Sequence, residues 1–302
     1  MLFLIIAIIS NCTVTLVFRA TDKKVNGDIT MMINYWICTV GAAATVIAQK
    51  KFYVFSELFN ADISTMFKTP SLGGTALLAL VLGGLNGIYY VVNLLIKRHS
   101  MFLNGTALTE MFSKVNFIIP VFVAFLLWKE TPGLLHLFGI VLAVIGMAIT
   151  SLDFKGSTKI QKPMLLFSTF LVLGFINTNM KLFSAYSAQG FSDVFVFMIF
   201  AVATVLCTWM TLSKIKKNGE KLKLTPQYFL YGTLVGIPNF MHSSFMMKSL
   251  ETLPAAIVYP TESAGTLLII TIVSWLFFKE KLNSKQAVSI LLTLAALILI
   301  NI

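Results

Sequence analysis

Long apolar stretches run through this chain from end to end, and they constrain its fold more than any other feature. Several of them reach the length of about 20 residues that a helix needs to cross the hydrocarbon core of a bilayer. With 57% hydrophobic and 12% charged residues, the chain has more apolar surface than a soluble core can cover. The sequence therefore predicts an integral, multi-pass protein of a plasma membrane, such as the inner membrane of a bacterium.

Ten apolar segments can be delimited, and each is predicted to be a transmembrane helix of an all-α protein. They cover about residues 2–18, 30–48, 72–96, 103–128, 134–152, 163–183, 191–212, 227–247, 253–278 and 286–301. The first segment resembles a secretory signal in position. We expect it to be a helix of the bundle, because no basic residue precedes it and no small-residue cleavage site follows before Arg19.

A short motif recurs at the midpoint and near the end of the chain. The sequence WKET at Trp128 to Thr131 is answered by FKEK at Phe278 to Lys281, 150 positions later. This repetition predicts two five-helix repeats, at residues 1–152 and 153–302. Many secondary transporters hold their solute between two such repeats, so the organisation indicates a carrier.

Polar residues form matching stripes on the third and eighth segments. The first stripe has the spacing i, i+3, i+4, i+7 and i+11, and consists of Asn86, Tyr89, Tyr90, Asn93 and Lys97. The second repeats the spacing about 153 positions later with Asn239, His242, Ser243 and Met246. Each set lies on one face of a helix. Any single member can be explained by hydrogen bonding between helices, but two matching stripes favour a shared polar cavity.

Three of the ionisable residues inside the apolar segments are candidates for a role in transport: Glu110, Lys114 and Glu262. A charge near the centre of a bilayer costs about 2.5–3.5 kcal/mol on insertion scales, so such residues pair with one another, face a wet cavity or serve transport. Glu110 and Lys114 are four positions apart and can pair along their own helix. Glu262 has no basic residue three or four positions away, which makes it the main candidate for a functional residue.

Carboxyl groups beside aromatic rings suit two kinds of chemistry. A carboxyl group partly removed from water holds its proton at higher pH and can couple transport to protons, and carboxylates among tyrosine rings also attract amines. His242 is open to three interpretations: proton relay, substrate ligand or packing residue. The predicted substrate-binding residues are Asn86, Tyr89, Tyr90, Asn93, Glu110, Asn239, His242, Tyr259 and Glu262. The predicted coupling residues are Glu262, Glu110 and Lys114.

Other classes of site are not indicated by the sequence. Cys12, Cys38 and Cys207 fall inside predicted helices without paired spacing, so we expect packing residues and no metal site or disulfide. We find no pattern typical of an enzyme and expect no cofactor. The net charge of +11 comes from lysines concentrated in loops, which indicates a membrane surface and no nucleic acid. The expected partners are a small-molecule substrate, the lipid bilayer and protons, and the expected state is a monomer or homodimer.

The stretch from Ile118 to Ile149 closely resembles the fourth and fifth helices of an EamA-type repeat in the drug/metabolite transporter (DMT) superfamily. Pro120, Glu130, Gly139 and Gly146 match its pattern. The second copy keeps the acidic residue as Glu280 and departs from the pattern at three positions, which are Ile270, Ser289 and Ala296. The specific residues of the resemblance therefore lie mostly in the first half.

The resemblance implies ten transmembrane helices in two inverted five-helix repeats, with the fifth and tenth helices outside a central cavity. Members of the family move amino acids, nucleotide sugars, amines and drugs, many as exporters. Our hypothesis is a secondary active transporter that moves a small polar metabolite, an amino acid or an amine, by alternating access with proton-coupled export. The alternatives are an uptake carrier for a cationic metabolite such as choline, or a flippase or accessory subunit for lipid-linked groups. Orientation stays open, because the lysine distribution favours both termini outside whereas termini in this family are usually cytoplasmic.

Overall fold

The computed structural model describes residues 1–21, 27–63, 66–67, 69–104, 106–130, 132–152, 161–219, 222, 224–277 and 284–302. The elements in chain order are α1 (Leu2–Thr21), α2 (Gly27–Ala48), the 3₁₀ helix η1 (Lys51–Asn60), α3 (Leu72–Leu78), the π-helical turn η2 (Ala79–Gly83), α4 (Gly84–Asn104), α5 (Thr106–Val115), α6 (Ile118–Trp128), α7 (Leu134–Leu152), α8 (Pro163–Tyr186), α9 (Ser192–Lys217), α10 (Pro226–Thr252), α11 (Ala255–Phe277) and α12 (Ser284–Asn301). All ten predicted segments contain helix, and no strand occurs in the described residues. The all-α prediction is confirmed.

Five of these helical runs are long and apolar enough to cross a membrane. They are Gly27–Ala48, Leu72–Asn104, Pro163–Tyr186, Ser192–Lys217 and Ala255–Val273. Shorter apolar helices cover Leu2–Val17, Phe112–Trp128, Leu134–Ile149 and Ala287–Asn301. Helix α10, the eighth predicted segment, is in neither group, because polar residues interrupt its apolar sequence. The chain is therefore a multi-pass integral membrane protein.

The fourth predicted segment is divided into two helices, which corrects the prediction of one continuous helix over 103–128. Proline has no backbone N–H and its ring collides with the carbonyl four residues earlier, and four residues before Pro120 stands Asn116. The Asn116 carbonyl instead accepts a hydrogen bond from the N–H of Ile119 at 3.1 Å. The turn at 116–117 thus separates α5 from α6.

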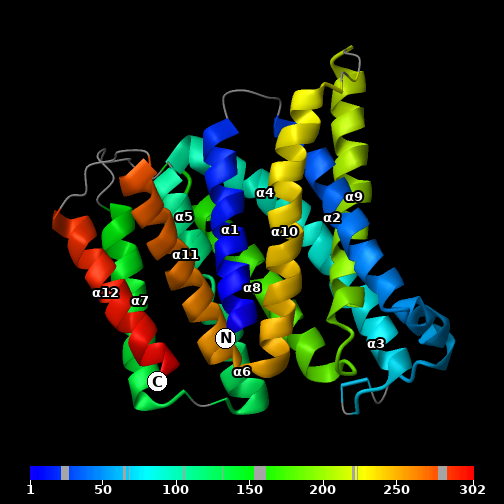
Figure 1. The fold of residues 1–302 in the computed structure, drawn as a ribbon, viewed down its shortest axis with the longest axis horizontal. Coiled ribbons are helices and arrows are strands. Elements are labelled where there is room, and N and C mark those ends of the chain that lie inside the picture. The colour runs from blue at the N-terminus through cyan, green and yellow to red at the C-terminus, as the bar shows by residue number, and fades with distance from the viewer. Residues whose placement is uncertain are drawn as a thin grey trace. The chain divides into compact units, whose positions relative to one another are not determined.

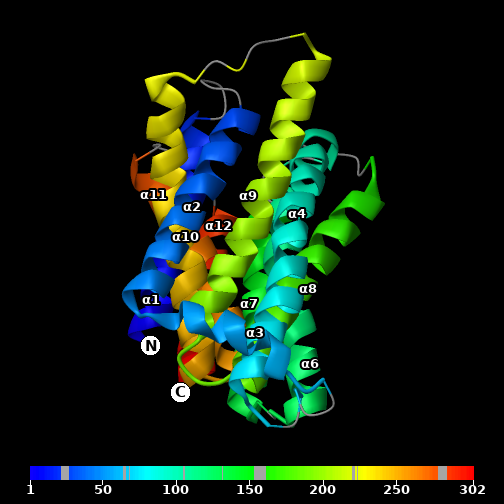
Figure 2. The same cartoon turned by 90° about the vertical axis from the view of Figure 1, so that its right-hand side faces the viewer.

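The third predicted segment is longer than expected and contains a change of helical type. It runs without interruption through α3, η2 and α4, and its part in the first unit lies beside α9 (Figure 2). A Cβ atom on Gly87 would lie 2.6 Å from the Ile199 carbonyl oxygen, and one on Gly83 would lie 2.9 Å from Cβ of Met198. Glycine at both positions lets the two backbones approach closely.

The structure divides into two compact units. The first contains Met1–Val91 and Leu182–Glu251, and the second contains Val92–Lys181 and Thr252–Ile302. Each unit takes segments from both halves of the sequence: α2 packs along α9 in the first unit, and α7 along α12 in the second (Figure 1). The boundary predicted between residues 152 and 153 stays a prediction. The second copy of the recurring motif, FKEK at Phe278 to Lys281, lies outside the described residues.

Small residues form the contact between α7 and α12. A Cβ atom on Gly139 would lie 2.7 Å from the Ile300 side chain, and one on Gly146 would lie 2.7 Å from Oγ1 of Thr293. The backbone of Ala296 lies near Gly139, and Oγ of Ser289 donates a hydrogen bond to the Gly146 carbonyl at 2.5 Å. Glycine at both positions lets α7 and α12 approach each other closely. Ser289 and Ala296, where the second repeat departs from the family pattern, are the residues that face them.

Candidate functional site

The two polar stripes meet in the first unit. The hydroxyl groups of Tyr90 on α4 and Ser243 on α10 are 3.2 Å apart, and these residues are 153 positions apart in the sequence. Their separation equals the offset between the two stripes. The contact therefore joins corresponding positions of the third and eighth segments. The Tyr90 ring also packs edge-on against Phe200, with 5.9 Å between ring centroids.

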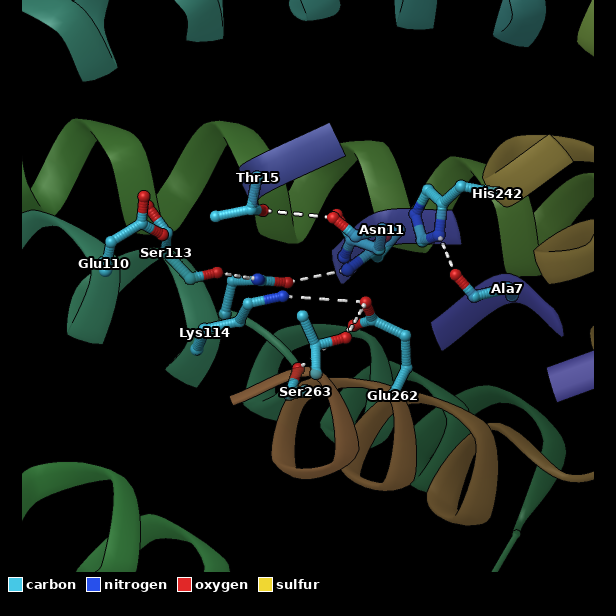
Figure 3. Close-up of polar contacts among 12 residues, drawn as sticks. Ala7, Asn11, Thr15, Glu110, Ser113, Lys114, His242, Glu262 and Ser263 are labelled. Carbon is cyan, nitrogen blue, oxygen red and sulfur yellow. Dashed lines mark hydrogen bonds and ion pairs between the residues drawn. The ribbon is translucent and has the colours of Figure 1, made fainter. Parts of the chain in front are cut away.

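The other polar residues of the α10 stripe contact neighbouring helices of the same unit. Asn239 donates from Nδ2 to Oδ1 of Asn34 on α2 at 3.2 Å. Nδ1 of His242 lies 3.1 Å from the Ala7 carbonyl on α1 (Figure 3). A histidine tied to a backbone carbonyl has a structural role at that nitrogen, which supports the packing interpretation.

The α4 stripe differs in exposure along its length. Asn86 is fully buried, whereas Tyr89 and Asn93 are partly exposed. Within the described part of the chain, Oδ1 of Asn93 is buried without a hydrogen-bond donor. A buried acceptor without a donor costs about 1–3 kcal/mol, so this oxygen is available to a ligand that carries an N–H or O–H group.

Glu262 has a basic partner that its sequence neighbours do not supply. Lys114 on α5 places its Nζ 3.6 Å from Oε1 of Glu262 on α11, and the two side chains are 13% and 11% exposed. Thr266 donates to the same oxygen at 3.1 Å, and Ser263 donates to Oε2 at 3.5 Å. Figure 3 shows the Lys114 side chain directed at this carboxylate. The basic partner of Glu262 therefore comes from another helix, which spacing along its own helix could not indicate.

Glu110 and Lys114, which could pair along their own helix, each have another partner in the structure. Glu110 is 3.0 Å from Nζ of Lys97 on α4, and Lys114 turns to Glu262. Both partners come from other helices, so neighbouring residues of α5 connect to α4 and to α11. Side-chain exposures of 29% and 26% for Lys97 and Glu110 make this pair the wetter of the two. The three predicted coupling residues thus belong to two ion pairs of the second unit.

Tyr259 is bound to protein through its hydroxyl group. It is 1% exposed, and its hydroxyl donates to the Asn177 carbonyl on α8 at 2.5 Å. The Asn177 side chain donates in turn to Oδ1 of Asn116 at 2.7 Å. This series of bonds links α11, α8 and the turn that Pro120 imposes. The contacts favour a structural role for Tyr259 over direct contact with a substrate.

Glu130, the acidic residue of the family pattern, binds two elements at once. Its Oε1 lies 2.6 Å from Nζ of Lys181 on α8, and its Oε2 accepts a hydrogen bond from the N–H of Ala255, the first residue of α11, at 2.9 Å. The Lys181 ammonium also lies 5.5 Å from the ring centre of Trp128. A carboxylate at a helix N-terminus is favourable. The site therefore fixes the start of α11 against α8.

Sequence reasoning did not identify Asp193, an acidic residue that is 4% exposed. It stands in the first turn of α9 and lies 3.3 Å from Lys51 and 3.9 Å from Lys248. An acidic residue at the start of a predicted helix was a usable signal. The two lysines are distant in sequence and could not have been assigned to it.

The cysteines agree with their predicted role as packing residues. Cys12, Cys38 and Cys207 are buried and unpaired with one another. Among the described residues no group of three or more His, Cys, Asp or Glu side chains is arranged to hold a metal ion.

Comparison with known proteins gives three similarities. The profile of the EamA-like transporter family matches residues 163–302, the half that departs from the proline and glycine pattern. The quaternary ammonium compound-resistance protein QacH of Staphylococcus saprophyticus is 36% identical over 73 residues, which cover 24% of this chain and 68% of QacH. A solved crystal structure has the same fold, with a TM-score of 0.70 and 12% identity over 99% of this chain and 94% of that one.

Proposed function

Because this chain belongs to the EamA-like transporter family of the DMT superfamily, we propose that it exports a small amine or ammonium compound by alternating access in exchange for protons. The observation that carries the proposal is the carboxylate of Glu262, 8% exposed on α11 and held by Lys114 and two hydroxyl groups. A carboxylate removed from water attracts a cation strongly.

The similarity to QacH favours a cationic substrate over a neutral one. QacH is named for resistance to quaternary ammonium compounds. Among the predicted binding residues, Glu110 and Glu262 supply negative charge and Asn93 supplies a buried acceptor oxygen. All the predicted binding residues stay predictions, including Asn86, Tyr89, Tyr90, Asn239, His242 and Tyr259, and the two carboxylates make the second unit the first place to test.

Two observations support the proposal that the halves 1–152 and 153–302 are inverted repeats. The second and seventh predicted segments pack together as α2 and α9, and the fifth and tenth as α7 and α12. Tyr90 and Ser243 contact each other at corresponding positions. Helices that pair with their own counterparts are typical of halves related by a two-fold axis.

The test is transport in proteoliposomes that carry an imposed pH gradient. We expect the gradient to drive uphill movement of radiolabelled choline or tetraethylammonium by the wild-type protein. Glu262→Gln should abolish the movement, because the amide carries no charge. Glu251→Gln is the matched control, because Glu251 is exposed at the end of α10. Equal flux through Glu262→Gln and the wild-type protein would remove Glu262 from the mechanism, and absence of flux for every amine tested would refute the proposed substrate class.

A further inference from the structure

Three ion pairs of the second unit differ in length and exposure. Their Nζ to carboxylate distances are 2.6 Å for Lys181–Glu130, 3.0 Å for Lys97–Glu110 and 3.6 Å for Lys114–Glu262. Charge-assisted hydrogen bonds of this kind have their optimum near 2.7–2.9 Å. The Lys114–Glu262 pair is thus the loosest of the three and, at 13% and 11% exposure, it is also shielded from water on both sides. Because a cation that takes the place of the lysine keeps the carboxylate paired, the pair with the longest direct contact is the one most readily exchanged.

We infer that Lys114 is a tethered competitor for the substrate cation at Glu262 and that its ammonium group, not the Glu262 carboxyl group, carries the exchanged proton. This inference rests on the proposed function and assigns the coupling step within it. In the resting state the Lys114 ammonium neutralises Glu262. An incoming cation takes its place beside the carboxylate. Thr266 and Ser263 keep that carboxylate in position through their hydroxyl groups.

The displaced ammonium loses its proton for an electrostatic reason. A buried charge that has lost its counter-ion costs several kcal/mol, and buried groups respond by becoming neutral. The N–H bond of the ammonium breaks, its electron pair stays on nitrogen as a neutral amine, and the proton leaves to water. Each state then holds one positive charge beside Glu262, either the lysine or the cation. One cation therefore exchanges for one proton, and the site keeps its net charge.

The ionisable groups near Lys114 and Glu262 do not alter the exchange of one cation for one proton. Glu110 stands one turn from Lys114 on α5 and already holds Lys97. On the elements that pack against α5 and α11, α6 contributes no ionisable residue, α7 contributes His136 in its first turn, and α12 contributes Lys285 near its start. Tyr259 on α11 has its hydroxyl engaged with the Asn177 carbonyl. Lys114 is thus the group whose charge changes when Glu262 changes partner.

Quaternary ammonium probes can show whether Lys114 or Glu262 carries the exchanged proton. They have no N–H group, so any proton released on binding comes from the protein. Purified protein in weakly buffered detergent solution is titrated with tetraethylammonium, and a pH-indicator dye reports proton release. We expect wild-type protein to release about one proton per cation bound. Lys114→Met should bind the cation several-fold more tightly, because the competitor is gone, and should release none. In proteoliposomes it should keep downhill flux and lose uphill flux driven by the pH gradient.

Arginine at the same position supplies the second test. It keeps the positive charge, so it can be used even if the methionine variant does not fold. A guanidinium group stays protonated under all relevant conditions. Lys114→Arg should therefore keep the ion pair and lose cation binding by about tenfold or more, because the competitor can no longer become neutral. Lys216→Met, at an exposed lysine near the end of α9, is the control and should behave as wild type.

The outcomes distinguish this inference from the proposed function. Wild-type protein that binds no quaternary ammonium probe refutes the substrate class itself. Wild-type protein that binds and exports the probe, while Lys114→Met still releases one proton per cation, assigns the proton to Glu262 or another group and overturns the role of Lys114. Cation binding by Lys114→Arg equal to that of wild type overturns it as well.

Discussion

Neutralising Lys114 and Glu262 one at a time and together measures how strongly the pair is coupled. At 3.6 Å, Coulomb's law with an effective dielectric constant of about 20 gives an attraction of about 4.6 kcal/mol. Removing one member of a buried pair leaves the other charge without its counter-ion and costs about 3–5 kcal/mol. Exposures of 13% and 11% leave little room for solvent screening. Lys114→Met and Glu262→Gln should each lower the free energy of unfolding by that amount.

The double variant should cost no more than either single variant, because no unpaired charge remains. The coupling energy of the cycle is then about 3–5 kcal/mol. Equilibrium unfolding by dodecyl sulfate in mixed micelles, followed by tryptophan fluorescence, measures it. The control cycle uses Lys97→Met and Glu110→Gln, whose side chains are 29% and 26% exposed, and should give a coupling energy of about 1 kcal/mol or less. Additive costs in the first cycle, or single variants that cost under about 1 kcal/mol, would refute the buried ion pair.

Three further substitutions test other parts of the structure. Gly146→Leu should destabilise the protein by about 3 kcal/mol or more and separate α7 from α12, since even a Cβ atom would lie 2.7 Å from Thr293; a thermal midpoint equal to wild type would contradict that contact. Glu130→Gln should cost about 3 kcal/mol by leaving Lys181, 10% exposed, without its counter-charge, and adding Lys181→Met should restore most of it in dodecyl sulfate titrations. Lys129→Gly should stabilise by about 1 kcal/mol, because Lys129 is left-handed with φ of 53°, and lower stability would show that its side chain makes a needed contact.

The positions of the helices could be predicted from the sequence because they depend on local hydrophobicity. Every predicted apolar segment is helical, and the errors lie at segment ends and at Pro120. That proline was read as a mark of family resemblance. Its missing N–H also divides the fourth segment at Asn116, which a stricter use of helix-breaking rules could have found.

The partners of the charged residues could not be predicted, because they come from helices distant in the sequence. The i, i+4 spacing made Lys114 a possible partner of Glu110. In the structure Glu110 is bound by Lys97, 13 positions away, and Lys114 binds Glu262 on α11. Tyr90 and Ser243 are separated in the sequence by the 153 positions that separate the two polar stripes. This spacing showed that the two residues correspond, but it could not show that their hydroxyl groups touch. Similarly, the family profile matches residues 163–302, whereas the recognisable proline and glycine residues lie in the first half.

The acidic residues differ in what their surroundings allow, and the difference separates structure from transport. Glu130 is bound at 2.6 Å by Lys181 and at 2.9 Å by a backbone N–H that begins α11, so releasing it would disturb two helices at once. Glu262 is held at 3.6 Å by Lys114 of α5 and by hydroxyl groups of its own helix, so exchanging the lysine for another cation breaks one contact between helices. An acid that must change partner in each transport cycle needs the second kind of surroundings. The contacts of Glu130 therefore suit an architectural role, and those of Glu262 suit the exchange that we propose.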